Sequence, residues 1–419
     1  MRGRTLAIAL AGLACVALAA PDVGAASISR SRLRHGLSNQ MHRVGGASGA
    51  FVTDLGPSDR RTLFSDAARR RRILASNSKL FSMSAVLNRF GADGTLKTAL
   101  YPRPADGIQG DVLHGSLVVV GAGDPALASA SFARRNGLPL TPLGKLASAV
   151  RQAGIRKITG KIRADDTVFD RRRTVPTTGV NASGELGPLS GLSYDSGISH
   201  GHYAGAPELV AARALKSRLR HDGVRVKGGI GREDLSQRLL SKPPLANVAS
   251  PPIQTLLAAT LKPSNNFFAE MLTKRLAARG GIRGTTRRGV QKVKRFARRL
   301  GTGVRMEDGS GLSRRNRASP KQVTRLLVAM SHRSDGPILR DSLPTAGREG
   351  TLSHRMNGTA AAGRCEAKTG TLIGVSALSG YCDAGHGVVA FSFLMNSVNI
   401  NTAQKAQDKM TQLIARYRP

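Results

Sequence analysis

Tryptophan is absent from this sequence, and aromatic residues make up only 4% of its 419 residues. Aliphatic side chains must therefore fill the core. The length is enough for two or three domains. A hydrophobic content of 40%, with 48 glycines and 19 prolines, is typical of a folded globular protein. Internal repeats and low-complexity tracts are also missing from the sequence.

Acidic residues are scarce as well. There are 26 Asp and Glu residues against 64 Lys and Arg, a formal charge of +38. Such a balance can indicate nucleic-acid binding, and Lys274–Arg299 contains eleven basic residues without an acid. Phe296 is the only aromatic residue there, so platforms for base stacking are missing. We expect no nucleic acid, and either anionic envelope polymers as partners or a solvated arginine-rich surface. Charge alone does not decide between these two.

Residues 1–26 have the features of a secretory signal peptide. Arg2 and Arg4 form a positive start, Leu6–Ala20 is apolar, and the small residues Gly24–Ala26 follow. No later segment is long and apolar enough to cross a membrane. We therefore expect an exported protein, soluble in the periplasm or the extracytoplasmic cell envelope after signal cleavage.

Cysteines are few. Cys15 as a lipid attachment site is the less favoured alternative to signal cleavage, because Gly12 stands where a large aliphatic residue is expected. Without Cys15, only Cys365 and Cys382 remain, in an oxidising compartment. A hairpin turn is expected at their midpoint, Ile373–Gly374, which would place them opposite each other within disulfide reach. The alternative is two unpaired small hydrophobic residues.

Apolar runs bounded by turn residues predict short strands near both ends of the mature chain. The early strands are Ala50–Leu55 and Thr62–Ser65, and the late strands are Glu366–Thr371, Val375–Cys382 and Gly387–Met395. We expect an α+β fold, in which an antiparallel sheet built from early and late strands is flanked by helices.

Apolar residues at three- and four-residue steps predict helices. The clearest pattern is Leu80, Met83, Leu87 and Phe90, with Gly91 placed to end the helix. Further helices are expected at Leu143–Ala153, Leu209–His221, Ile253–Leu261, Asn266–Ala278 and Thr402–Tyr417.

The segment 106–240 consists of short strands, turns and helices. We expect it to be an inserted α+β domain, shorter than usual for the family named below. It would interrupt a discontinuous catalytic domain of residues 27–105 and 241–419.

Three short motifs follow in order, and the first is Ser76-Asn-Ser-Lys79. Ser76 opens a helix and Lys79 lies three residues on, so both side chains project from one face about 5–6 Å apart at Cβ. A hydroxyl is a weak nucleophile that needs a base. A lysine can be that base when burial or nearby positive charge lowers its pKa. At average composition a chain of this length contains Ser-x-x-Lys by chance roughly once.

The second motif, Ser264-Asn-Asn266, follows the helix break at Pro263. The Ser264 hydroxyl would relay a proton to a leaving amine. The Asn266 amide would bind a substrate carbonyl through its donor and steady Lys79 through its acceptor. Seen alone, the motif is equally typical of a helix cap. We interpret a second Ser-x-Asn, at Ser397–Asn399, as such a cap.

The third motif, Lys-Thr-Gly, opens a predicted strand. Lys368 and Thr369 can bind a carboxylate, such as the free end of a D-alanine or the acid of a β-lactam. Gly370 lets a substrate lie against the strand as an added edge. The backbone N–H of Thr371 would join that of Ser76 as an oxyanion hole. At average composition the triplet occurs by chance in roughly one in ten such chains.

Together the motifs resemble those of penicillin-binding proteins and serine β-lactamases. Ser264 follows Ser76 by 188 residues, and Lys368 follows Ser264 by 104. The long first gap is similar to that of the D-alanyl-D-alanine carboxypeptidase/endopeptidase family (peptidase family S13, class C low-molecular-mass penicillin-binding proteins). The resemblance covers essentially the whole mature chain. The local sequences that carry it are Leu74–Phe81, Gly121–Pro125, Ser264–Glu270, Asp308–Ser313 and Ala346–Leu352.

The resemblance implies a transpeptidase-like serine enzyme that needs no metal or other cofactor. Ser76 would attack the D-Ala-D-Ala carbonyl with the help of Lys79, and Ser264 would pass a proton to the departing D-alanine. Water would then hydrolyse the acyl-enzyme, and β-lactams would inhibit it. Because the insertion is shorter than in the best-known members, one of their two extra domains would be reduced or missing. The sequence does not separate carboxypeptidase from endopeptidase.

The sequence speaks against a dinucleotide-binding loop, a metal site and a Ser-His-Asp hydrolase. The strand Ser116–Val120 precedes a glycine pair, but Pro125 and the lack of a third glycine exclude a dinucleotide loop. His200 and His202 have no third metal ligand at useful spacing, and no Gly-x-Ser-x-Gly elbow is present. Two alternatives stay open: a β-lactamase or esterase of the same fold, and a non-catalytic wall-binding protein with a vestigial site.

Overall fold

The computed structural model describes residues 26–56, 61–175, 185–235 and 237–419. The signal-peptide prediction, except for its last residue, and Cys15 lie outside these residues. A five-stranded antiparallel sheet forms one end of the molecule, in the order β18-β19-β20-β1-β2. Its strands are β1 (Ala47–Asp54), β2 (Thr62–Asp66), β18 (Cys365–Leu372), β19 (Val375–Asp383) and β20 (Val388–Asn396). The prediction of a sheet built from early and late strands is confirmed.

Helices cover both faces of this sheet. Successive side chains of a strand point to opposite faces, so each strand contributes to two separate cores. On β20, Phe391 and Phe393 pack against α1 (Arg30–Val44) and α12 (Ile400–Arg416). Leu394, on the opposite face, joins the core of a second helical layer. That layer consists of α2 (Ser78–Phe90), α7 (Ile253–Leu261), α8 (Asn266–Arg275), α9 (Thr286–Arg299), α10 (Pro320–Ser331) and α11 (Gly336–Asp341).

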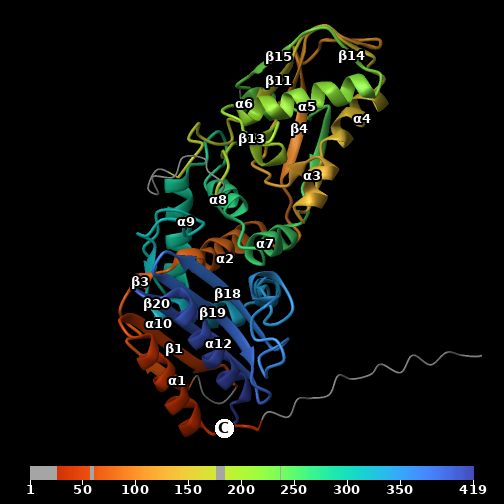
Figure 1. The fold of residues 1–419 in the computed structure, drawn as a ribbon. Coiled ribbons are helices and arrows are strands. Elements are labelled where there is room, and N and C mark those ends of the chain that lie inside the picture. The colour runs from red at the N-terminus through yellow and green to blue at the C-terminus, as the bar shows by residue number, and fades with distance from the viewer. Residues whose placement is uncertain (1–25, 57–60, 176–184, 236) are drawn as a thin grey trace, which may run out of the picture.

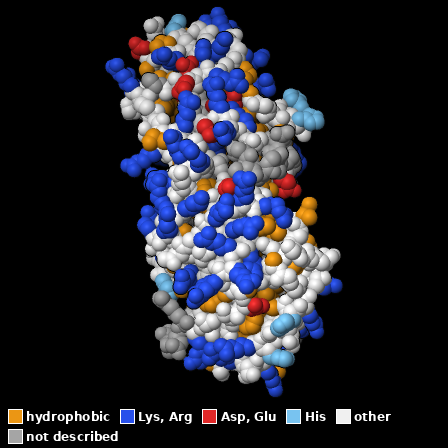
Figure 2. Space-filling view, turned by 90° about the vertical axis from the view of Figure 1, so that its left-hand side faces the viewer, with side chains coloured by type: hydrophobic (Ala, Val, Ile, Leu, Met, Phe, Trp, Pro, Cys, Tyr) orange, Lys and Arg blue, Asp and Glu red, His pale blue; other side chains and the backbone are white. Residues whose placement is uncertain are grey.

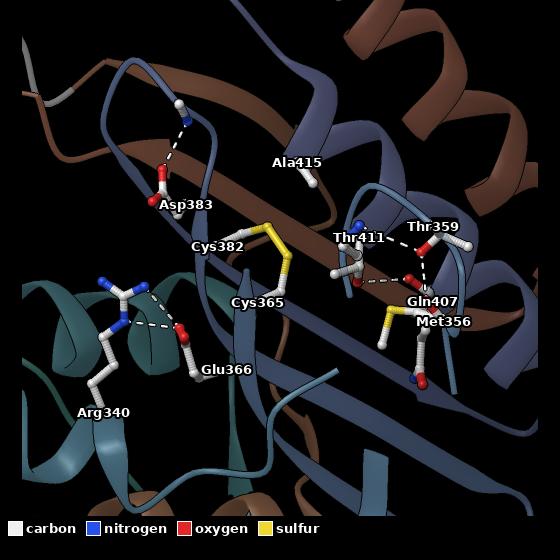
Figure 3. Close-up of a disulfide and its surroundings, with 12 residues drawn as sticks. Arg340, Met356, Thr359, Cys365, Glu366, Cys382, Asp383, Gln407, Thr411 and Ala415 are labelled. Atoms are coloured by element: carbon white, nitrogen blue, oxygen red, sulfur yellow. Dashed lines mark hydrogen bonds and ion pairs between the residues drawn. A yellow bond between two sulfur atoms is a disulfide. The ribbon is translucent and has the colours of Figure 1, made fainter. Parts of the chain in front are cut away.

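The expected hairpin and disulfide are both present. Strands β18 and β19 pair from Cys365↔Cys382 to Leu372↔Val375, so the turn falls at Ile373–Gly374. The two cysteines form a disulfide across the strands, next to the ion pair of Arg340 and Glu366 (Figure 3). The pairing and the disulfide therefore fix the position of β18, the strand that carries the third motif, relative to β19.

The inserted segment has two larger sheets, ordered β15-β11-β7-β4-β16 and β14-β10-β6-β5, and the strand pairs β8-β9 and β12-β13. Its strands are β4 (Lys97–Arg103), β5 (Ile108–Gln109), β6 (Val112–Leu113), β7 (Ser116–Val120), β8 (Leu127–Ala128), β9 (Thr141–Pro142), β10 (Lys157–Ile158), β11 (Ile162–Asp165), β12 (Ile198–Ser199), β13 (His202–Tyr203), β14 (Arg225–Val226), β15 (Ile230–Arg232) and β16 (Ala246–Ala249). Its helices are α3 (Ala130–Arg135), α4 (Gly144–Gln152), α5 (Pro207–His221) and α6 (Gln237–Leu240). Because β4 and β16 pair within the first of these sheets, that sheet reaches beyond the expected boundaries 106 and 240.

The molecule is elongated, with the insertion at one end and the five-stranded sheet at the other (Figure 1). The two parts share a core, because Phe169, Leu186 and Leu189 of the insertion are buried in one cluster with Leu80 of α2 and Phe268 of α8. The sequence motifs lie near this junction. Among the described residues, no helix combines the length and the apolar character that a membrane crossing requires.

Candidate active site

Ser76 lies in a short 3₁₀ turn, η1 (Ala75–Asn77), that runs directly into α2. The predicted proximity of the first motif is present: the Lys79 Nζ atom donates a hydrogen bond of 3.0 Å to Ser76 Oγ. Lys79 is fully buried, whereas Ser76 keeps partial exposure. A reagent at the surface can therefore reach the hydroxyl, while the lysine is withdrawn from water.

Two glycines allow other backbone segments to approach Ser76. A Cβ added to Gly370 on β18 would lie 3.1 Å from the Ser76 amide nitrogen and 2.9 Å from the Leu74 carbonyl oxygen. A Cβ on Gly311 would overlap the Ala75 carbonyl, and Gly311 has a φ of 95°. At Gly311, only glycine tolerates both the lack of space for a Cβ and the positive φ. The site is thus built from segments far apart in the sequence that pack backbone against backbone.

All three donors of the Lys79 ammonium group have acceptors. Besides Ser76 Oγ, they are Asn266 Oδ1 at 2.7 Å and the Ser310 carbonyl oxygen at 2.8 Å. Burial lowers the pKa of Lys79 to about 7, although the nearby carboxylates of Asp308, Glu270 and Glu185 act in the opposite direction. Near neutral pH a substantial fraction of Lys79 is therefore an uncharged amine that can take up a proton.

The second motif lies on the turn between α7 and α8. Ser264 is partly buried, with a left-handed φ of 64°, and Asn265 caps α8 by accepting from the Phe268 amide at 3.0 Å. The acceptor of Asn266 faces Lys79 as expected. Its donor contacts the Glu185 backbone oxygen at 3.0 Å and the Glu185 carboxylate at 3.4 Å. The insertion therefore contributes a residue to the edge of the site.

The Ser397–Asn399 motif has the role that we predicted for it. Asn399 caps α12, because its Oδ1 atom accepts from the Thr402 amide at 3.1 Å.

The third motif lies on β18, as predicted. Lys368 is fully buried and its Nζ donates to the Thr369 carbonyl oxygen at 3.0 Å. Burial, together with the positive charge of Lys79, holds the pKa of Lys368 well below its usual range. Thr369 Oγ1 lies 2.7 Å from Thr351 Oγ1. Thr371 is exposed farther along the strand.

Sequence reasoning did not assign roles to several residues that support the site. The segment 308–313 folds around the Asp308 carboxylate, which accepts from the backbone amides of Gly311 and Ser313. Asn316 donates to Asp308 Oδ1 at 2.6 Å and to Ser78 Oγ at 3.0 Å. The signal in the sequence was the local resemblance at Asp308–Ser313, which did not show that Asn316 meets Ser78, 238 positions away.

His200 and His202 lie at the short hairpin of β12 and β13, where His200 Nδ1 contacts Ser199 Oγ at 3.1 Å. Among the residues that the structure describes, no group of three or more His, Cys, Asp or Glu side chains is arranged to hold a metal ion.

Comparison with solved structures defines the fold. The chain superposes on the crystal structure of penicillin binding protein 4 from Haemophilus influenzae with a TM-score of 0.74 and 22% identity, over 89% of this chain and 97% of the other. The same protein complexed with a novel β-lactam gives a TM-score of 0.69 and 22% identity, over 90% and 98%. The fold is therefore that of a penicillin-binding protein.

Sequence comparison identifies the family. The model of the D-Ala-D-Ala carboxypeptidase 3 (S13) family matches residues 36–185 and 195–417, and this chain belongs to that family. It is 30% identical over 455 residues to a D-alanyl-D-alanine carboxypeptidase of Actinomadura sp. (strain R39), covering 89% of this chain and 82% of the relative. The family expected from the order and spacing of the motifs is confirmed.

Proposed function

We propose that this protein is a serine-type D-Ala-D-Ala carboxypeptidase or D,D-endopeptidase that trims peptidoglycan peptides through an acyl-enzyme on Ser76. The observation that carries the proposal is the contact of a buried Lys79 amine with the Ser76 hydroxyl at 3.0 Å. The name of the Actinomadura relative and the β-lactam bound to the Haemophilus protein agree with this substrate class.

In the acylation step, uncharged Lys79 takes the proton of Ser76 Oγ while the oxygen attacks the carbonyl between the two D-alanines. The backbone N–H groups of Ser76 and Thr371 are the oxyanion donors that we assign. Gly370 supports this assignment, since its lack of a side chain brings β18 next to the Ser76 amide. Asn266 keeps the Lys79 amine directed at Ser76.

Binding and release use the other two motifs. Lys368 and Thr369 hold the carboxylate of the terminal D-alanine, or that of a β-lactam. Ser264 passes a proton to the amine of the departing D-alanine, and water then hydrolyses the ester on Ser76.

The decisive experiment is labelling with a fluorescent penicillin. Wild type and Ser84→Ala should acquire a covalent label, and Ser76→Ala should not. Ser84 is the matched control because it lies on α2, the helix that follows the turn of Ser76, and its hydroxyl bonds only to the Leu80 carbonyl among the described residues. An unlabelled wild type would exclude the proposal. A labelled Ser76→Ala protein would show that the nucleophile is another residue.

The same assay separates the alternatives. Rapid loss of label from wild type would favour a β-lactamase or esterase. Binding to wall material without any label would favour a non-catalytic wall-binding protein. Release of D-alanine from a pentapeptide identifies a carboxypeptidase, and cleavage of a crosslinked dimer identifies an endopeptidase.

We propose further that the protein is exported and that residues 1–26 are removed. The Cys365–Cys382 disulfide supports this, because such bonds persist in oxidising compartments. N-terminal sequencing of the protein from a periplasmic or cell-envelope fraction should give a start near residue 26 or 27. An intact Met1 in that fraction would contradict signal cleavage.

The basic surface supports a proposal for anionic envelope polymers as partners. Lys and Arg side chains spread over the whole face shown in Figure 2. One hollow stands out: a groove of about 770 Å³ along α5, lined by Arg213, Lys216, Arg220 and His221 without a carboxylate. Arg213, Lys216 and Arg220 form no ion pair with another described residue. They recur at helical spacing, so they present a row of positive charge to a repeating anion.

The test of this partner uses inorganic polyphosphate as the probe. Replacing Arg213, Lys216 and Arg220 together by Gln should weaken binding at least about tenfold, since clustered contacts release more counterions than scattered ones. The control replaces three exposed basic residues of the opposite end, Arg32, Arg43 and Lys405, and removes the same charge. Equal weakening in both variants would show a diffuse basic surface without a site.

A further inference from the structure

A buried carboxyl group acts on Lys79 through its charge and has no part in the steps above. Glu270 is on α8, one helical turn after Asn266, and is fully buried. Its Oε1 atom accepts hydrogen bonds from the backbone amides of Gly309 at 2.8 Å and Ser310 at 2.7 Å. Its Oε2 atom is buried without a hydrogen-bond partner among the described residues. A carboxylate held in this way organises a backbone turn.

Glu270 holds the amide of Ser310, the residue whose own carbonyl oxygen contacts Lys79. The Ser310 carbonyl oxygen accepts from Lys79 Nζ at 2.8 Å, and the Gly309 carbonyl oxygen accepts from Ser82 Oγ of α2 at 2.8 Å. Residues 309–310 are therefore fastened to α8 on one side and to α2 on the other. Two side chains of α8 act on the same ammonium group: Asn266 directly, and Glu270 through the backbone of Ser310.

Glu270 also acts on Lys79 through its charge. Burial and the neighbouring carboxylate of Asp308 raise the pKa of Glu270 to about 7. Ionised Glu270 stabilises the ammonium form of Lys79 and so raises the lysine pKa. Protonated Glu270 has no such effect and leaves the free amine favoured. The protonation state of Glu270 therefore shifts the balance between the ammonium form and the free amine of Lys79.

Other charged groups face this pair from several elements. Asp308 lies beside both, Lys274 of α8 feels the charge of Glu270, and Lys368 of β18 and Glu185 of the insertion face Lys79. Asp308 holds the Gly311 amide on the far side of the Ser310 carbonyl, and Glu270 holds the Ser310 amide on the near side, so both carboxylates act on Lys79 through charge and through the backbone. Removal of Glu270 should therefore affect geometry and charge together.

We propose that Glu270 is a positioning residue that fixes the Ser310 carbonyl against Lys79 and sets the protonation state in which Lys79 receives the proton of Ser76. The inference rests on the proposed function, because it gives Glu270 a part in the acylation of Ser76. It assigns no contact between Glu270 and the substrate.

The test measures the acylation rate with a fluorescent penicillin from about pH 5 to about pH 9, across the range in which a base of pKa near 7 titrates. Glu270→Gln keeps an oxygen acceptor for both amides and removes the charge. Because Glu270 of the wild type is itself protonated well below pH 7, the rate of the Gln variant relative to wild type should be highest near pH 7, by up to about twofold, and should fall back toward pH 5 and pH 9. Glu307→Gln removes a surface carboxylate of the same segment and should leave the profile unchanged.

Two further variants separate position from charge. Glu270→Ala removes the acceptor and should lower the rate at least about tenfold at every pH, with Gln restoring most of it. Glu270→Asp retains a charge but retracts it from residues 309–310, and should also acylate slowly, which provides a test even where the Gln variant folds poorly.

A Glu270→Gln profile that coincides with that of wild type, or that falls by the same factor at every pH, would overturn the inference. So would a Glu270→Asp variant that acylates at the wild-type rate. A wild-type protein that takes no label at all would instead overturn the proposed function, and the role of Glu270 with it.

Discussion

The side-chain amide of Asn77 donates a hydrogen bond of 3.0 Å to the backbone carbonyl oxygen of Lys368. Both residues are fully buried. Asn77 directly follows Ser76, and Lys368 opens the third motif, so this contact ties the nucleophile segment to the strand expected to bind the substrate carboxylate. One side chain thus bonds together two motifs separated by almost 300 residues, in addition to the backbone packing at Gly370.

Asn77→Ala should slow acylation by about tenfold, since losing one buried hydrogen bond costs about 1–2 kcal/mol, which is about a tenfold change in rate where the transition state bears the loss. The rate is measured with a fluorescent penicillin and the stability by thermal unfolding. A loss of stability without slower acylation would show that the contact serves folding alone.

The acylation rate should depend on pH through Lys79. Burial lowers its pKa to about 7, and only the uncharged amine accepts the Ser76 proton. The rate should therefore rise as pH increases toward about 7 and level off above it. Lys79→Arg carries a permanent charge and should lose about 10²–10⁴-fold in acylation at every pH. A flat wild-type profile across pH 7 would rule out Lys79 as the base.

Gly311→Ala should destabilise the fold strongly. Its Cβ would overlap the Ala75 carbonyl, and its φ of 95° strains any other residue, so we expect a cost of about 2–4 kcal/mol in unfolding free energy. Gly374→Ala is the control, because Gly374 also has a positive φ, of 69°, but open space around it. That change should cost about 1 kcal/mol. Denaturant unfolding compares the two, and equal losses would show that packing against Ala75 is unimportant.

Replacing Cys365 and Cys382 together by Ser should lower the unfolding free energy by about 2–4 kcal/mol. The bond closes a loop with a sequence separation of 17 and anchors one end of β18. Thermal unfolding of oxidised, reduced and doubly substituted protein measures the effect. Wild type under reducing conditions should match the substituted protein, and unchanged stability in both would contradict a structural role.

Local patterns in the sequence predicted much of the fold. The strand Ser116–Val120 has the predicted bounds, and the helix predicted to end at Gly91 does so, with the Gly91 amide bonded to the Leu87 carbonyl. The hairpin at Ile373–Gly374 has the position expected between the two predicted strands, midway between the cysteines. These features depend on residues close in sequence, whose preferences act before any tertiary contact forms.

Features that depend on distant partners escaped prediction. The strand Lys97–Arg103 was assigned to the catalytic part, yet it pairs with β7 and β16. In α9, the face formed by Gly289, Val290 and Phe296 is buried, but the surrounding basic residues obscured its periodicity. Periodicity reveals a buried face, but it does not name the segment that will cover it.

In the candidate site, too, motif residues were predicted from the sequence, whereas residues that act through distant contacts were not. The order of the three motifs indicated Ser76, Lys79 and Asn266, and the structure brings their side chains together. Glu270 is an ordinary helical residue in sequence terms, and nothing local shows that its carboxylate meets the amides of residues 309–310, nearly 40 positions later.

The backbone at the two ends of the described chain forms a small parallel bridge. The Ile28 amide donates to the Arg416 carbonyl at 3.0 Å, and the Arg418 amide donates to the Ile28 carbonyl at 3.1 Å. Handles attached at the two ends would therefore leave the molecule at nearly the same point, away from the insertion (Figure 1). Immobilisation through either handle would present the same orientation to a suspension of wall fragments. A short linker between Ile28 and Tyr417 would also permit a circularly permuted chain, reopened in an exposed loop, because adjacent ends are what permutation requires.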